Sequence, residues 1–105
     1  MKFGTFHLME RPFERSEAEI YDNHIEQITV ADELGFDACW LTEHHFSSAP
    51  YVPDVSGEYC VSASPFAMAC AVARITKKIR IGSAVKILPL EHPLRTAEEL
   101  SLIHI

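Results

Sequence analysis

The stretch that decides the fold is "GFDACWLTEHHF", residues 35–46, in which an apolar run leads directly into an acid and two adjacent histidines. Residues 36–42 are apolar nearly throughout, without alternation, and such a run is typical of a parallel strand covered on both faces. Gly35 stands where a left-handed residue commonly ends a helix. We therefore expect a helix to end at Gly35, a buried strand to follow, and a polar cluster to lie at the carboxyl end of that strand.

The segment before this strand predicts a helix with one buried stripe. Ser16 and Glu19 have the spacing of a capping box, with Ser16 as the cap. The residues that recur at helical intervals are Ile20, His24, Ile28, Ala31 and Leu34. Further back, residues 2–8, "KFGTFHL", are short, apolar and aromatic, and they predict a first strand.

The segments after "EHHF" repeat this order. Residues 47–63 predict a loop whose length is usual for functional segments. Ser64 and Pro65 predict the cap and first turn of a second helix, and the stretch "IRIGSAVKILPL" predicts a third strand over residues 79–88. Thr96 and Glu99 have the spacing of a capping box that would open a last helix. The order β-α-β-α-β-α predicts a parallel sheet with right-handed crossovers.

Three strands do not complete a domain of this kind. A parallel sheet of three strands leaves one edge unpaired and one apolar face open to water, and a complete (β/α)8 barrel needs roughly 250 residues. We therefore expect an α/β fold that is part of a parallel (β/α)8 TIM barrel, with only the first three β/α units present. A small, open, doubly wound sheet is the alternative.

Composition narrows the classes of partner. The chain has 105 residues, 48% of them hydrophobic, and a formal net charge of −6, which argues against nucleic acid or an anionic membrane as the main partner. No apolar run reaches the ~20 residues that span a bilayer, and the start lacks the pattern of a signal peptide, so we expect the cytoplasm. Cys39, Cys60 and Cys70 stand in apolar text and are expected to be small buried hydrophobes.

The strand ends carry the candidate chemistry, because sites in parallel α/β sheets form beyond the carboxyl ends of the strands. His44 and His45 follow the second strand directly, and neighbouring strand residues point to opposite faces. One imidazole should therefore face the site while the other bonds into the wall; a purely structural cluster is the alternative. A metal site is disfavoured, because no third nearby ligand is evident. We expect three further residues to be structural: His7, His24 and Trp40, the last in the core or on the helix-facing wall.

Three blocks together resemble a known family. "MKFGTFHL", "ADELGFDACWLTEHHF" and "IRIGSAVKILPLEHPLRTAEE" are similar, in order and spacing, to the amino-terminal part of bacterial luciferase-like monooxygenases, over residues 1–99. The resemblance implies a (β/α)8 barrel that binds reduced FMN, or less often a deazaflavin, and oxidises an organic substrate with O2. It also implies a flavin reductase as partner and a homo- or heterodimer formed through the early helices.

The resemblance also assigns residues. His44 matches the active-site histidine, a candidate acid/base beside the flavin, and Glu43 matches its acidic neighbour. Ala84 and Val85 match a pair that often forms a non-prolyl cis peptide against the flavin ring, and Gly82 would permit a close approach by a neighbour or by the ligand. The phosphate-binding positions of the family lie outside this chain.

The ending and the activity of the chain are separate expectations. Residues 100–105, "LSLIHI", depart from the family pattern, resemble an artefactual tail, and are assigned no function. The fragment alone is expected to be inactive. Two alternatives remain for the protein: a non-catalytic flavin-binding or partner subunit of the same barrel family, and, less favoured, a metal-dependent hydrolase of barrel type.

Overall fold

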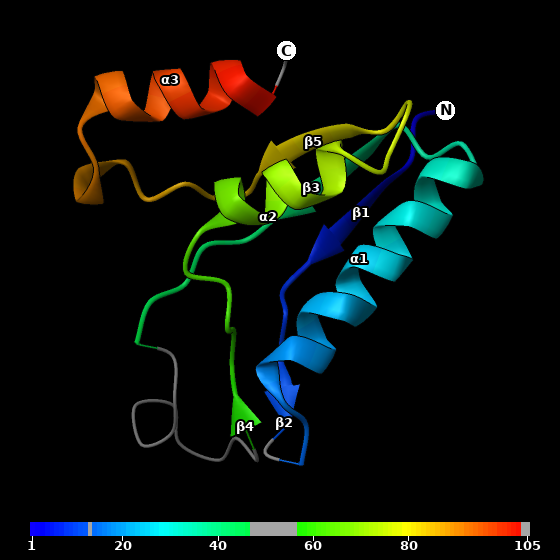
Figure 1. The fold of residues 1–105 in the computed structure, drawn as a ribbon, viewed down its shortest axis with the longest axis horizontal. Coiled ribbons are helices and arrows are strands. Elements are labelled where there is room, and N and C mark those ends of the chain that lie inside the picture. The colour runs from blue at the N-terminus through cyan, green and yellow to red at the C-terminus, as the bar shows by residue number, and fades with distance from the viewer. Residues whose placement is uncertain (13, 47–56, 104–105) are drawn as a thin grey trace.

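A computed structural model describes residues 1–12, 14–46 and 57–103 of the chain (Figure 1). Its centre is a three-stranded parallel sheet with the strand order β1-β3-β5, joined by helices. A second pair of short strands, β2 and β4, is antiparallel. The elements are β1 (Gly4–His7), β2 (Arg11–Pro12), α1 (Glu17–Glu33), β3 (Ala38–Leu41), β4 (Gly57–Glu58), α2 (Pro65–Ala73), β5 (Arg80–Ser83), a 3₁₀ turn (Leu88–Leu90) and α3 (Pro93–Ile103).

Helix α1 begins and ends where local signals place it. The Ser16 hydroxyl accepts a hydrogen bond from the Glu19 amide at 3.3 Å, and the Glu19 carboxylate accepts one from the Ser16 amide at 2.7 Å, which completes the predicted capping box. Gly35 follows the helix with a φ of +82°, a conformation that favours glycine. The prediction for Leu34 is wrong: it is the C-cap and is 72% exposed, because the helix ends before its last turn can press that side chain onto the sheet.

The core lies between the sheet and helices α1 and α2. Alternate residues of β3, Cys39 and Leu41, point into it, and Ile28 of α1 and Val72 of α2 meet them from the helix side. Trp40, between the two buried strand residues, therefore points away from the helices and is 44% exposed. The expectation of a core or helix-facing Trp40 is wrong, because strand alternation gives the helix side to its neighbours.

The face opposite the helices, here called the open face, carries Phe6, Trp40 and Gly82 in one register row across the three strands. Phe6 is 62% exposed. Within the described residues, one face of the sheet is therefore apolar and uncovered, as the sequence predicts for three strands alone.

Other boundaries differ from the sequence predictions. The third strand stops at Ser83 rather than at residue 88, and Thr96 does not cap α3. That helix begins at Pro93, where the His92 imidazole accepts from the Leu94 amide at 3.3 Å. Cys70 is exposed, whereas Cys39 and Cys60 are buried as predicted.

The remaining sequence predictions concern the connecting segments and the end of the chain. Of the loop predicted over residues 47–63, residues 47–56 lie outside the described part of the chain, and Gly57–Glu58 form β4. Residues 100–103 continue α3, and Ile103 packs against the core. Among the helices of the described residues, none is long and apolar enough to cross a membrane.

Candidate functional site

The carboxyl ends of the three parallel strands meet at one edge of the sheet. His7, Leu41 and Ser83 stand in register as their last residues. The ladder continues one step further, because the Thr42 amide donates to the His7 carbonyl at 3.4 Å and the Ala84 amide donates to the Leu41 carbonyl at 2.8 Å. The Thr42 hydroxyl also donates to the His7 carbonyl, at 2.9 Å. The residues that follow β3 and β5, including Glu43 and Ala84, are thereby brought side by side.

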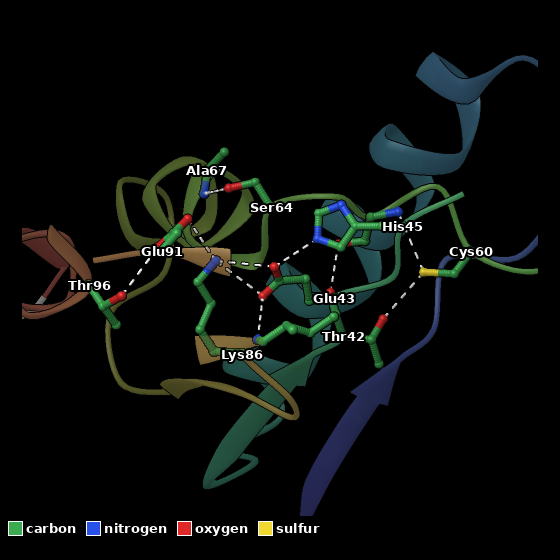
Figure 2. Close-up of polar contacts among 11 residues, drawn as sticks. Thr42, Glu43, His45, Cys60, Ser64, Ala67, Lys86, Glu91 and Thr96 are labelled. Carbon is green, nitrogen blue, oxygen red and sulfur yellow. Dashed lines mark hydrogen bonds and ion pairs between the residues drawn. The ribbon is translucent and has the colours of Figure 1, made fainter. Parts of the chain in front are cut away.

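Glu43 is the hub of this edge (Figure 2). Glu43 is 2% exposed. Its carboxylate accepts hydrogen bonds from the Ile87 amide at 3.0 Å, from the Lys86 ammonium at 3.2 Å and from His45 Nε2 at 2.9 Å. Burial alone would raise the pKa of Glu43, but the hydrogen bonds from His45, Ile87 and Lys86 outweigh it and hold the pKa below its ordinary value. The carboxylate is therefore ionised at neutral pH.

The two adjacent histidines have different partners. His45 bonds to Glu43 and its side chain is 29% exposed. The His44 backbone amide donates to the Ser62 carbonyl at 2.9 Å, and its ring packs edge-on against Tyr59 with 5.0 Å between ring centroids. The doublet thus divides into one imidazole tied to a carboxylate and one against an aromatic ring; the catalytic role of each stays a prediction.

The peptide bond between Ala84 and Val85 is cis, as the resemblance implied. Val85 is 62% exposed at the strand end. Gly82 lies on the open face, and a Cβ atom placed there would come within 2.6 Å of Trp40 Cζ3. The missing side chain at Gly82 therefore makes room for a neighbour within the chain, and its contact with a cofactor stays a prediction.

Sequence reasoning missed Lys86 and Glu91. The Lys86 side chain is 7% exposed, and its ammonium lies 2.8 Å from the Glu91 carboxylate as well as 3.2 Å from that of Glu43. The available signal was a lone cation inside "AVKILPL", at a strand end where a charge must find a partner if it is buried. Nothing in the local pattern named Glu43 as that partner, since it lies on another strand.

Two further features bear on the chemistry. Within residues 1–12, 14–46 and 57–103, no group of three His, Cys, Asp or Glu side chains is close enough to hold a metal ion. A hollow of about 510 Å³ lies at the β5 edge, lined by residues that include Trp40, Ile79, Gly82 and Ile103. It includes none of the strand-end residues, so we place the candidate chemistry at Glu43 and its neighbours and not in this hollow.

Comparison with known proteins decides the family. Residues 1–104 match the profile of the family described as luciferase-like monooxygenase. The chain belongs to the luciferase-like monooxygenase family. The alkanal monooxygenase alpha chain of Photorhabdus laumondii is 33% identical to it over 103 residues, covering 98% of this chain and 26% of that protein. The chain thus spans about a quarter of the length of this luciferase-like relative.

Solved structures of similar proteins share the fold. The structure of apo-MsnO8 superposes with a TM-score of 0.84 at 25% identity, covering 98% of this chain and 28% of that one. The oxygenating constituent of 3,6-diketocamphane monooxygenase from Pseudomonas putida, solved in complex with FMN, gives a TM-score of 0.79 at 26% identity, covering 98% and 26%. An α/β fold with a parallel sheet is thus common to this chain and to luciferase-like monooxygenases.

Proposed function

We propose that this chain is the amino-terminal part, the first three β/α units, of a (β/α)8-barrel monooxygenase that oxidises an organic substrate with O2 and reduced flavin. The observation that carries the proposal is the family match over residues 1–104, together with His44, Glu43 and the Ala84–Val85 peptide at one sheet edge. FMN is the proposed flavin, because a similar protein was solved in complex with FMN. The protein would act in the cytoplasm.

The residues at this edge fit a planar ring. Ala84 is small and its amide is fixed by the Leu41 carbonyl, while the exposed Val85 offers apolar surface beside it. Ala84 and Val85 would hold the ring, while Gly82, whose missing side chain leaves room for Trp40, would contribute only its backbone. When bound, reduced flavin supplies the electrons that activate O2; the protein binds, orients and moves protons.

His44 is the proposed acid/base. Within the described residues, no side chain hydrogen-bonds to its ring, whereas the neighbouring His45 is engaged by Glu43. An imidazole can take up or release a proton near neutral pH, so the imidazole without a carboxylate partner is the one that can exchange a proton with a reactant. Glu43, buried and bonded to three donors, would act by orienting its neighbours.

The test is His44→Ala in the full-length protein that contains this chain, assayed by formation of the oxygenated product from a panel of alkanals and cyclic ketones with reduced FMN and O2, because free reduced FMN consumes O2 without an enzyme. Loss of a general acid/base lowers turnover by about 10²–10⁴-fold, so a loss of that size with an unchanged circular dichroism spectrum supports the role. Lys2→Met, an exposed change, is the control. Unchanged turnover in folded His44→Ala would remove His44 from the mechanism.

The same full-length protein also distinguishes a catalytic monooxygenase from the main alternative, a non-catalytic subunit. A protein that binds FMN yet forms no oxygenated product from any substrate, even with a flavin reductase present, would favour the non-catalytic flavin-binding or partner subunit. The reductase and a homo- or heterodimer formed through α1 and α2 are the proposed partners. For the 105-residue chain alone, we expect no tight uptake of FMN in a fluorescence titration, because the phosphate-binding positions of the family lie outside it; stoichiometric uptake would contradict this.

A further inference from the structure

The ammonium group of Lys86 is enclosed where several elements meet. Besides Glu43 at the end of β3 and Glu91 after the 3₁₀ turn, it lies 5.4 Å from the ring centroid of Phe66 in α2. The second carboxylate is tied in turn to α3, because the Thr96 hydroxyl donates to Glu91 at 3.2 Å (Figure 2). Lys86 thus joins the β3 end to the segment after β5 through its charge.

Stability does not explain why a lysine occupies this place. Removing two charges from water costs about as much as their attraction returns, and apolar residues of similar volume often stabilise a protein equally well. A buried ion pair does, however, fix the positions of the groups that it joins. The question is therefore what Lys86 and Glu43 hold in place.

Both groups are charged in the folded chain. Burial lowers the pKa of Lys86, but hydrogen bonds to Glu91 and Glu43 outweigh it and raise the pKa above its ordinary value. The pKa of Glu43 is lowered by its three donors against the opposing effect of burial. An ionised carboxylate only accepts hydrogen bonds, so every group that contacts Glu43 must donate to it.

This requirement fixes the proton on His45. Its Nε2 lies 2.9 Å from Glu43 Oε1, so Nε2 carries the hydrogen, and a neutral His45 then has a bare Nδ1. The same carboxylate holds the Ile87 amide at 3.0 Å. One side chain thereby positions an imidazole and the backbone two residues beyond Val85.

We propose that Lys86 is a positioning residue: it holds Glu43 as a fixed, ionised acceptor, and so sets the tautomer of His45 and the place of the Ile87 backbone beside the Ala84–Val85 peptide. Among the residues that the structure describes, the titratable groups that face Glu43 are Lys86 and His45, with Glu91 on the far side of the ammonium. The consequence for catalysis rests on the function proposed above, whereas the arrangement itself does not.

The test uses this chain, labelled with ¹⁵N, at neutral pH. Long-range ¹H–¹⁵N spectra report the tautomer of His45, and hydrogen exchange reports the Ile87 amide. The unsubstituted chain should show a single tautomer with hydrogen on Nε2. Lys86→Met should give a mixture of tautomers and exchange the Ile87 amide about tenfold faster, because the acceptor is no longer held.

Two variants serve as matched controls. Lys86→Arg keeps the charge but changes the shape of the side chain, and it should keep the tautomer. If Lys86 acted through packing alone, Lys86→Arg would disturb His45 as Lys86→Met does. Lys2→Met removes an exposed lysine and should change neither signal.

A neutral His45 that carries its hydrogen on Nδ1 and not on Nε2 in the unsubstituted chain would overturn the proposal without any variant. Unchanged His45 and Ile87 signals in folded Lys86→Met would overturn it as well. If Lys86→Met does not fold, Lys86→Gln replaces it, because glutamine fills the site with a polar side chain that carries no charge. A mixture of His45 tautomers in Lys86→Gln would support the proposal, and unchanged His45 and Ile87 signals would overturn it. No measurement involves flavin, so failure of the flavin proposal and failure of this one are distinguishable.

Discussion

His7 occupies a position where a charge would be costly. It is 2% exposed, its Nδ1 lies 2.9 Å from His24 Nδ1, and its Nε2 lies 2.8 Å from the Thr5 hydroxyl. Burial, with a smaller contribution from the charge on His24, lowers the pKa of His7 from 6.5 to about 4. The imidazole is therefore neutral in the folded chain at neutral pH, and it ties β1 to α1 as the structural role predicted from sequence requires.

This depressed pKa predicts a loss of stability in mild acid. Between pH 6.5 and about 4, the unfolded chain binds a proton at His7 that the folded chain does not, so stability present above pH 6.5 falls as the pH drops toward 4. The difference between the two pKa values corresponds to at most ~3 kcal/mol. Urea unfolding of the chain at pH 7 and pH 4.5 measures it. In His7→Gln the fall should be much smaller; an equal fall in both proteins would refute the assignment.

Gly82 gives a second prediction at the scale of one residue. A methyl group there would meet Trp40 at 2.6 and 2.8 Å, closer than atoms pack, so Gly82→Ala should push the indole off the sheet. Overpacking of this kind costs about 1–3 kcal/mol, which exceeds the gain of about 0.5–1 kcal/mol from replacing glycine in a strand. We expect a red-shifted emission from the single tryptophan and a lower free energy of unfolding. Unchanged emission would mean that Trp40 does not cover Gly82.

The elements differ in how far the sequence predicts them, and the reason is the distance over which their signals act. Helix α1 was predictable because Ser16, Glu19 and Gly35 act within a few residues of each end. Residues 84–88 are apolar enough to predict a longer β5, whereas Glu43, more than forty residues earlier, holds Ile87 off the ladder. Strands β2 and β4 have two residues each, too few for any period to be recognised.

Contacts between residues far apart in the sequence also connect α1 to the segment before β5, and the sequence alone does not predict them. Asp32, in the last turn of α1, is buried and accepts from the amides of Lys77, Lys78 and Ile79 at 2.7–2.8 Å. The hydrogen bond from the Ile79 amide is the largest influence on its pKa, which lies below the ordinary value despite burial. In the sequence Asp32 is one acid among many, and only the fold brings three donors to it.

Asp32→Ala should therefore destabilise the chain more than a surface change does. Each hydrogen bond to a charged group contributes roughly 1.5–3 kcal/mol, and amides left without a partner add to the loss, so we expect at least ~3 kcal/mol in urea unfolding. Asp22→Ala, an exposed position on the same helix, is the matched control and should lose under ~1 kcal/mol. Equal losses in the two variants would show that the amides find other partners.

At the scale of the whole molecule, the parallel sheet explains why a buried strand was predictable from the sequence and why the chain should associate with itself in water. Continuous apolar text at residues 36–42 predicted a strand with two covered faces, yet the described helices α1 and α2 cover only one face, and the open face keeps Phe6 and Trp40 exposed. Within the described residues β1 and β5 each pair only with β3, so both edges of the sheet also stay unpaired. Exposed apolar faces and free strand edges both favour association.

We therefore expect the chain to self-associate as its concentration rises, through the open face. Burying a phenylalanine side chain contributes about 1.5–3 kcal/mol, so Phe6→Thr should weaken the association about tenfold or more, while its β-branched side chain keeps the strand. Leu94→Gln removes an equally exposed apolar side chain from α3 and should leave the association unchanged. Sedimentation equilibrium measures all three proteins, and quenching of Trp40 by iodide should weaken as the associated form accumulates. A chain that stays monomeric to about 1 mM, or one for which Leu94→Gln weakens association as much as Phe6→Thr, would show that the open face is not the surface through which copies meet.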